Sequence, residues 1–181
     1  MMKLLEESLR KAPIVKKGDY NYVIHPLTDG IPFIQPALLN EVTEEMVHLI
    51  PSCGRIVTME AMGIPLATSL SLATGIPFTI IRKRKYGLPG EREVSQKTGY
   101  SETKLYINGI GEGDEIVIVD DVLSTGGTLV AVVDALKEMG VVIKGIFIAV
   151  NKGNREEVER RIGMRITTLV DISVDDEVNI L

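Results

Sequence analysis

The sequence of 181 residues lacks what several classes of protein need. It has no tryptophan, aromatic residues make up 4% of the chain, and its single cysteine is Cys53. Scarce aromatics disfavour the stacking platforms that bind single-stranded nucleic acid. A lone cysteine excludes an intramolecular disulfide and a cysteine-rich metal site, and we expect a reducing compartment, the cytoplasm.

An excess of positive charge and long apolar runs are missing as well. The chain carries 20 Lys+Arg against 25 Asp+Glu, a formal net charge of −5, which argues against binding to a nucleic-acid polymer or an anionic membrane. It has no run of about 20 apolar residues, the length that a membrane-spanning helix needs. Glu6 and Glu7 stand where a secretory signal would be apolar. The two histidines, His25 and His48, have no metal-ligand spacing.

The second half of the chain has the pattern of a parallel sheet. Short β-branched or apolar runs alternate with stretches of helical periodicity, which is typical of β-loop-α-β-α-β units and predicts an α/β fold with a mostly parallel sheet flanked by helices. The expected elements are strands over 115–119, 141–150 and 166–172, a helix over 129–139 that ends at Gly140, and a helix over 155–162 capped by Asn154.

The first half continues this pattern, with two irregular regions. We expect a helix over 41–50 capped by Asn40 or Thr43, a strand over 55–59, a helix over 65–74 and a strand over 78–82. Residues 1–39 predict a small cap, or hood, made of a helix over 2–11 and a proline-rich stretch, on a core over 40–181. Residues 86–104 show little apolar pattern and predict a mobile lid loop. The acidic 175–177 segment is expected near the cap or in solvent.

The residues that carry chemistry follow the strand over 115–119. Asp120 and Asp121 lie at its carboxyl end, where open α/β sheets bind ligands. The turn that opens the next helix combines hydroxyls with small residues, and its free N–H groups suit a phosphate. Carboxylates suit ribose hydroxyls or hydrated Mg²⁺ better than a phosphate. A purely structural turn is the alternative. The turn consists of Ser124, Thr125, Gly126, Gly127 and Thr128.

Residues 117–128 resemble the phosphoribosyl-diphosphate motif of type I phosphoribosyltransferases. That motif is a hydrophobic strand, two acids, two variable residues and a turn of the form small-Thr-Gly-small-Thr. Residues 58–67, 75–83 and 88–91 are similar to segments of the adenine-type branch of the family. Within that branch the chain is most similar to the archaeal enzymes that act on hypoxanthine and guanine.

The resemblance implies a purine-salvage reaction. A purine base attacks carbon 1 of phosphoribosyl diphosphate, pyrophosphate leaves, and hypoxanthine or guanine becomes IMP or GMP. It also implies Mg²⁺ held through the substrate near Asp120 and Asp121, and a homodimer. Two alternatives stay open: adenine as the substrate, and a ligand-sensing regulator that has the same fold without catalysis.

The resemblance also assigns roles to residues. Asp120 and Asp121 would hold the ribose hydroxyls, directly or through the metal, and the turn from Ser124 to Thr128 would bind the 5′-phosphate. Cations at the end of the strand over 78–82 would neutralise the leaving group, although a solvated strand end is the alternative. We expect roles for Arg82, as a catalytic residue, and for Lys83 and Lys85, and the smallest role for Arg84. The pyrophosphate would meet Glu60, Ala61 and Met62.

The base site and the proton acceptor are less well defined by the sequence. The expected base contacts are Ile31, Phe33, Ile34, Val122 and Leu123. The first three lie in the predicted cap, and ordinary packing within the cap is the alternative for them. Gly99 stands where adenine-type enzymes carry a glutamate, and Ser124 stands where hypoxanthine/guanine enzymes of the other branch carry an aspartate. The general base is therefore unassigned, with Glu93 and Glu102 as the remaining candidates.

Overall fold

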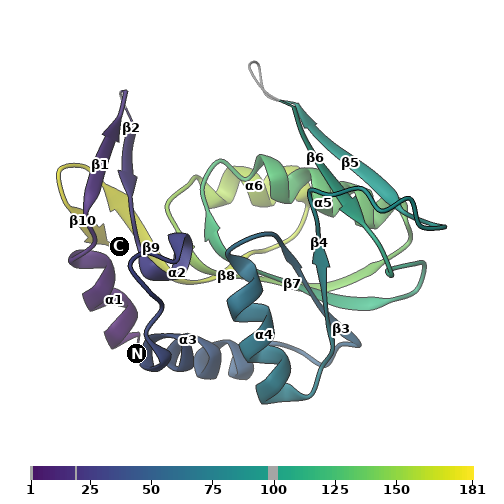
Figure 1. Cartoon of the computed structure of the whole chain (residues 1–181), viewed down its shortest axis with the longest axis horizontal. Coiled ribbons are helices and arrows are strands. Elements are labelled where there is room, and N and C mark those ends of the chain that lie inside the picture. Colours follow the sequence, from purple (N-terminus) through teal and green to yellow (C-terminus); the bar gives the residue numbers. More distant parts are fainter. Residues whose placement is uncertain (1, 19, 98–101) are drawn as a thin grey trace.

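A six-stranded sheet forms the centre of the computed structural model, which describes residues 2–18, 20–97 and 102–181 (Figure 1). The strand order is β10-β9-β8-β7-β3-β4, and all neighbours are parallel except β10 and β9. The predicted α/β fold is confirmed. The strands are β3 (Arg55–Met59), β4 (Phe78–Ile81), β7 (Glu115–Leu123), β8 (Val142–Asn151), β9 (Thr167–Val174) and β10 (Val178–Ile180).

Helices cover both faces of this sheet (Figure 1). Helices α5 (Gly127–Glu138) and α6 (Arg155–Ile162) pack on one face, and α1 (Lys3–Arg10), α3 (Pro36–Leu49) and α4 (Gly63–Thr74) pack on the other. Ile116 and Ile118 of β7 belong to the core under α5, and Val117 and Val119 belong to the core under α4. A strand that is buried on both faces explains the unbroken apolar run in the sequence.

Most predicted helices and strands are present, and the differences lie at their ends. The strand Arg55–Met59 and the helix Arg155–Ile162 have the predicted bounds, and Asn154 Oδ1 accepts a hydrogen bond from Glu157 N at 3.1 Å as a helix cap. The expected cap at Asn40 or Thr43 is wrong, because α3 begins at Pro36, whose fixed φ suits a first helical turn. Strand β7 runs to Leu123 and therefore includes the aspartate pair.

Residues 1–39, which are predicted to form a cap, contain more regular structure than the prolines indicate. A hairpin of β1 (Ile14–Lys17) and β2 (Tyr20–Val23) precedes the short helix α2 (Pro26–Asp29). The side chain of Asn21 donates a hydrogen bond to the carbonyl of Asp175 at 2.7 Å. This bond confirms that the acidic 175–177 segment lies near the cap.

The expectation of a loop over 86–104 is wrong for residues 92–97 and 102–104, which form strands. Strands β5 (Arg92–Lys97) and β6 (Glu102–Ile107) form an antiparallel hairpin, and β5 packs against α5. Val94, Leu105 and Ile107 are buried in the core under this hairpin. The strands are hard to see in the sequence because Leu105, Tyr106 and Ile107 are buried in succession and give no two-residue alternation. Residues 98–101, which include Gly99, lie outside the described residues.

No helix in the described ranges is both long and apolar enough to cross a membrane.

A carboxylate of α3 accepts hydrogen bonds from the start of α1. Glu41 of α3 accepts hydrogen bonds from Leu4 N at 3.0 Å and from Leu5 N at 2.9 Å. Free N–H groups at a helix start need such acceptors, since α1 has no side-chain cap of its own. We expect Glu41→Ala to lower the free energy of unfolding by about 1–2 kcal/mol, measured by urea denaturation. Glu41→Gln keeps one acceptor oxygen and serves as the milder control. An unchanged value for Glu41→Ala would contradict this role.

Candidate active site

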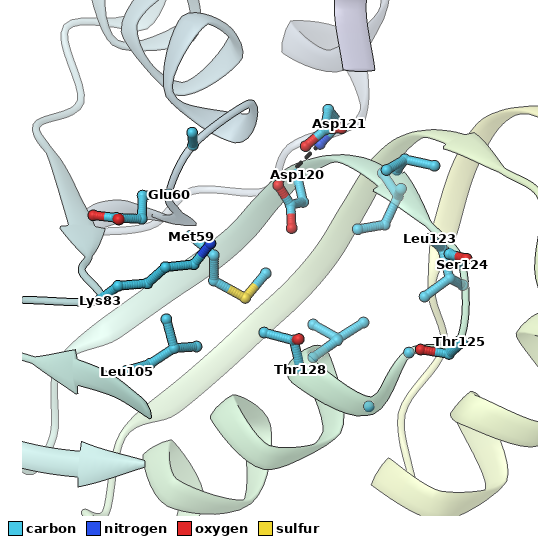
Figure 2. Close-up of a pocket in the computed structure, with 16 residues that line it drawn as sticks. Met59, Glu60, Lys83, Leu105, Asp120, Asp121, Leu123, Ser124, Thr125 and Thr128 are labelled. Carbon is cyan, nitrogen blue, oxygen red and sulfur yellow. Dashed lines mark hydrogen bonds between the residues drawn. The ribbon is translucent and has the colours of Figure 1, made fainter. Parts of the chain in front are cut away.

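A cavity of about 310 Å³ lies where β3 and β7 end (Figure 2). Because the carboxyl ends of parallel strands share one edge of the sheet, residues far apart in the sequence meet there. Leu105 of the β5–β6 hairpin contributes one wall. The cavity is lined by Met59, Glu60, Ala61, Lys83, Leu105, Asp120, Asp121, Val122, Leu123, Ser124, Thr125, Gly126, Gly127, Thr128, Leu129 and Ile148.

The aspartate pair is the electrostatic centre of this cavity. Asp121 is buried, and Asp120 Oδ1 accepts a hydrogen bond from Asp121 N at 3.1 Å (Figure 2). Burial raises the pKa of both carboxyls, and the charge of Asp120 raises the pKa of Asp121 further. At neutral pH the ligand-free pair therefore carries fewer than two negative charges, which reduces its repulsion of an anionic ligand.

The turn after β7 is shaped as an anion cradle. Helix α5 begins at Gly127 without a side-chain cap, and the N–H groups of a helix start suit an anionic ligand. Gly126 has φ +72°, and a Cβ atom there would lie 2.4 Å from Val158 Cγ2. A Cβ on Gly153 would lie 1.8 Å from the Ser124 carbonyl oxygen. Tight packing on both sides therefore fixes the turn from Ser124 to Thr128.

The basic residues 82–85, which follow β4, have different contacts. Lys83 lines the cavity, and its side chain extends toward Met59 (Figure 2). The guanidinium of Arg82 pairs with the carboxylate of Glu60, which also lines the cavity. Arg84 lies 5.6 Å from the ring centroid of Tyr86. Arg82 therefore meets the site through Glu60, while Arg84 and Lys85 are not among the lining residues.

Met62 also lies apart from the cavity that Glu60 and Ala61 line. The Cε atom of Met62 lies 3.5 Å from the place that a Cβ on Gly30 would take, at the end of α2. The Met62 side chain thus packs under the N-terminal cap. Only its backbone remains available for the predicted contact with pyrophosphate.

The predicted base contacts separate into two groups. Val122 and Leu123 line the cavity, as expected. Ile31 and Phe33 are 55% and 59% exposed, and neither they nor Ile34 line it. The buried apolar residues of the described part of 1–39 are instead Met2, Leu5, Leu9, Val23, Leu27 and Leu38.

The two candidates for the general base gain no support. Glu93 accepts a hydrogen bond from Lys104 Nζ at 2.9 Å and is not among the residues that line the cavity. The side chain of Glu102 and residues 99–101 lie outside what the structure describes. Ser124, in contrast, does line the cavity.

Lys152 is a residue of this region that the sequence reasoning missed. It follows β8 directly, and its backbone N–H donates to the carbonyl of Leu123 at 2.9 Å. Its Nζ atom lies 4.9 Å from the ring centroid of Tyr22 and 5.7 Å from that of Tyr20. The position after a parallel strand next to β7 was the available signal. A second cavity, of about 300 Å³, is lined by Tyr20, Asn21, Lys152, Val174 and Asp175.

A cap carboxylate faces Lys152 and fixes the tyrosine beneath it. Asp29 Oδ1 accepts a hydrogen bond from Tyr22 Oη at 2.6 Å, and Oδ2 accepts one from His25 N at 2.9 Å. Burial acts to raise the pKa of Asp29, but these bonds and the charge of Lys152 hold it below its usual value. Asp29 is therefore an ionised partner for Lys152 at neutral pH.

A family model and curated relatives agree on the family of this chain. The model of the phosphoribosyl transferase domain matches residues 55–179. The hypoxanthine/guanine phosphoribosyltransferase of Methanocaldococcus infernus is 57% identical over 175 residues, which cover 95% of this chain and 96% of that protein. The enzyme of the same name from Methanohalophilus mahii is 54% identical over 183 residues, and the alignment covers 100% of this chain and 96% of that protein.

Solved structures agree with the fold. The adenine phosphoribosyltransferase of Thermoanaerobacter pseudethanolicus superposes with a TM-score of 0.76 at 20% identity, covering 94% of this chain and 99% of that one. The adenine phosphoribosyltransferase of Saccharomyces cerevisiae gives a TM-score of 0.75 at 20% identity, and the superposition covers 93% of this chain and 97% of that one. At this identity the likeness concerns the architecture alone.

The raised pKa values of the aspartate pair predict how stability depends on pH. Between the unfolded and folded pKa values the folded chain holds more protons than the unfolded chain, so stability falls as pH rises. Compared with Asp121→Asn, which cannot ionise, the wild type should lose about 1–3 kcal/mol of unfolding free energy between pH 5 and pH 8. Urea denaturation of both proteins at the two pH values measures this difference. A difference that stays constant or changes in the opposite direction would contradict the burial of the pair.

Proposed function

We propose a mechanism for this chain, which belongs to the type I phosphoribosyltransferase family. It is a purine-salvage enzyme that transfers a phosphoribosyl group to hypoxanthine or guanine, the activity named for relatives that are 50–57% identical over nearly the full length. The observation that carries our site assignment is the cavity in which an aspartate pair adjoins an uncapped helix start.

In our proposal phosphoribosyl diphosphate binds along the edge of the sheet. The 5′-phosphate accepts hydrogen bonds from the turn at the start of α5, between Thr125 and Thr128, where the helix dipole adds a favourable field. The ribose hydroxyls donate to the carboxylates of Asp120 and Asp121. The diphosphate extends toward the backbone at Glu60 and Ala61 and toward Lys83.

The transfer step moves negative charge onto the leaving diphosphate. A ring nitrogen of the base forms a bond to carbon 1 of the ribose, the bond from carbon 1 to the diphosphate breaks, and the base gives up a proton to a general base. Lys83, inside the cavity, stabilises the charge that develops on pyrophosphate. Arg82 contributes at longer range and orients Glu60 through their ion pair.

Magnesium fits this site as an ion held jointly with the substrate. The described residues include no group of three or more histidine, cysteine or acidic side chains that could hold a metal. Asp120 and Asp121 alone would leave most positions of an octahedral Mg²⁺ to water and substrate oxygens, which is how proteins usually bind this ion. Mg²⁺ bound in this way supplies further charge neutralisation for the leaving group.

Lys152 is our candidate for recognition of the base. An ammonium has three donors and no acceptor, so it favours the 6-oxo group of hypoxanthine or guanine over the 6-amino group of adenine. Tyr20 and Tyr22 lie against it and limit its movement. Val122 and Leu123 would contact the base from the side of the aspartate pair.

A homodimer and a cytoplasmic location are the remaining parts of the proposal. They rest on the family resemblance and on the lone cysteine. Size-exclusion chromatography with light scattering measures the first directly.

A substrate screen tests the function. Hypoxanthine, guanine, adenine and xanthine are each incubated with phosphoribosyl diphosphate and Mg²⁺, and nucleotide formation is followed by chromatography. We expect hypoxanthine and guanine to react with kcat/KM at least about a hundredfold above adenine, because a donor-only side chain faces position 6. Preference for adenine would refute the role of Lys152, and transfer to none of the four bases would refute the function.

Substitution of Lys152 tests base recognition separately. Lys152→Met keeps the length of the side chain and removes the donor, and we expect kcat/KM for hypoxanthine to fall about 10–100-fold. The KM for phosphoribosyl diphosphate should stay within about twofold. Lys144→Met is the matched control, since Lys144 lies near the opposite end of β8 and pairs with Glu115 at 3.2 Å. Equal losses in the two variants would contradict the assignment.

A further inference from the structure

The hydroxyl of Thr58 in β3 is buried and unpaired in the part of the chain that the structure describes. The residue is 0% exposed, and within the described residues its Oγ1 atom has no hydrogen-bond partner. Buried polar groups in folded proteins are nearly always paired, so such an atom calls for an explanation. The hydroxyl can donate one hydrogen bond and accept two.

Asp120 is an acceptor close to this hydroxyl. Val57 pairs with Ile118 across β3 and β7, so the next residues along these strands are Thr58 and Val119, directly before Asp120. A Cβ atom built on Gly63 would lie 2.0 Å from Thr58 Oγ1 and 2.5 Å from Asp120 Oδ1. Both oxygens therefore lie close to the first residue of α4, and the Val119 carbonyl oxygen lies 3.3 Å from the same point.

Gly63 keeps the space between these oxygens open. Its φ is not positive, so the backbone would accept any residue, but every side chain would start inside this space. Helix α4 begins here without a side-chain cap, which places partial positive charge close to the carboxylate. The surroundings of Asp120 are thus built from a small residue, a helix start and one hydroxyl donor.

We propose that Thr58 is a positioning residue, whose hydroxyl donates to Asp120 when substrate engages that carboxylate and so fixes it for the ribose. This inference rests on the proposed function. An ionised carboxylate accepts several hydrogen bonds, and a bond to a charged acceptor is stronger than one between neutral groups. In the ligand-free protein the hydroxyl has no hydrogen-bond partner among the described residues. On binding, a small rotation of either side chain completes the bond.

Two threonine variants separate this role from simple packing. Thr58→Val has nearly the same shape and removes only the hydroxyl. We expect it to raise the KM for phosphoribosyl diphosphate roughly tenfold, with the KM for hypoxanthine within about twofold of wild type. Thr58→Ser restores the donor and should return the KM to within about threefold of wild type. The midpoint of thermal unfolding of Thr58→Val should equal or exceed that of wild type, since an unpaired buried group is removed.

Thr43 of α3 provides the matched control. It is also a buried threonine, but its Oγ1 donates to the Leu39 carbonyl at 2.7 Å and lies 2.8 Å from Ser69 Oγ. Thr43→Val should therefore lower the thermal midpoint and leave both KM values unchanged. The two valine variants are thus expected to show opposite patterns of stability and substrate affinity.

The outcomes distinguish the inference from the function on which it rests. A wild-type KM in Thr58→Val, with an active wild-type enzyme, overturns the role of Thr58 and leaves the function intact. Equal losses of affinity in Thr58→Val and Thr58→Ser, with lowered thermal midpoints in both, also overturn it, because packing then explains the effect. If the wild type transfers phosphoribosyl to none of the purine bases, both proposals fail.

Discussion

Parallel pairing of β3, β7 and β8 is the constraint on which the site depends. Because these strands run in one direction, their carboxyl ends lie at one edge of the sheet and bring Glu60, Asp120 and Lys152 into one region. None of these residues is near another in the sequence. The apolar packing on both faces of β7 holds this edge in place, so the site is built on rigid strands and on a turn fixed by glycine contacts.

Charge is distributed across this edge in a way that suits a substrate with many negative charges. Burial raises the pKa values of Asp120 and Asp121, which face this edge. Lys83 and the start of α5 supply positive potential inside the cavity, and Lys152 supplies it under the cap. A net charge of −5 therefore describes the whole surface and says little about the site.

The sequence predicted the parts of the molecule that are governed by local rules. The buried strand before Asp120, the small turn at 124–128 and the Asn154 cap are all short-range patterns, and the structure confirms them. The hairpin of β5 and β6 was missed, because its buried residues Leu105, Tyr106 and Ile107 are consecutive and give no two-residue alternation. Lys152 and the unpaired hydroxyl of Thr58 depend on which strands become neighbours. The position of Lys152 directly after a parallel strand was the one available signal, and the proximity of Thr58 to Asp120 has no signature in a single sequence.

A crystal structure of the complex with phosphoribosyl diphosphate and Mg²⁺ tests the central claim most directly. Our account predicts the 5′-phosphate on the backbone between Thr125 and Thr128, with the ribose hydroxyls on Asp120 and Asp121. The diphosphate should lie beside Glu60, Ala61 and Lys83. A phosphate bound instead in the neighbouring groove, which is lined by Arg92 and Arg161, would contradict the assignment of the site.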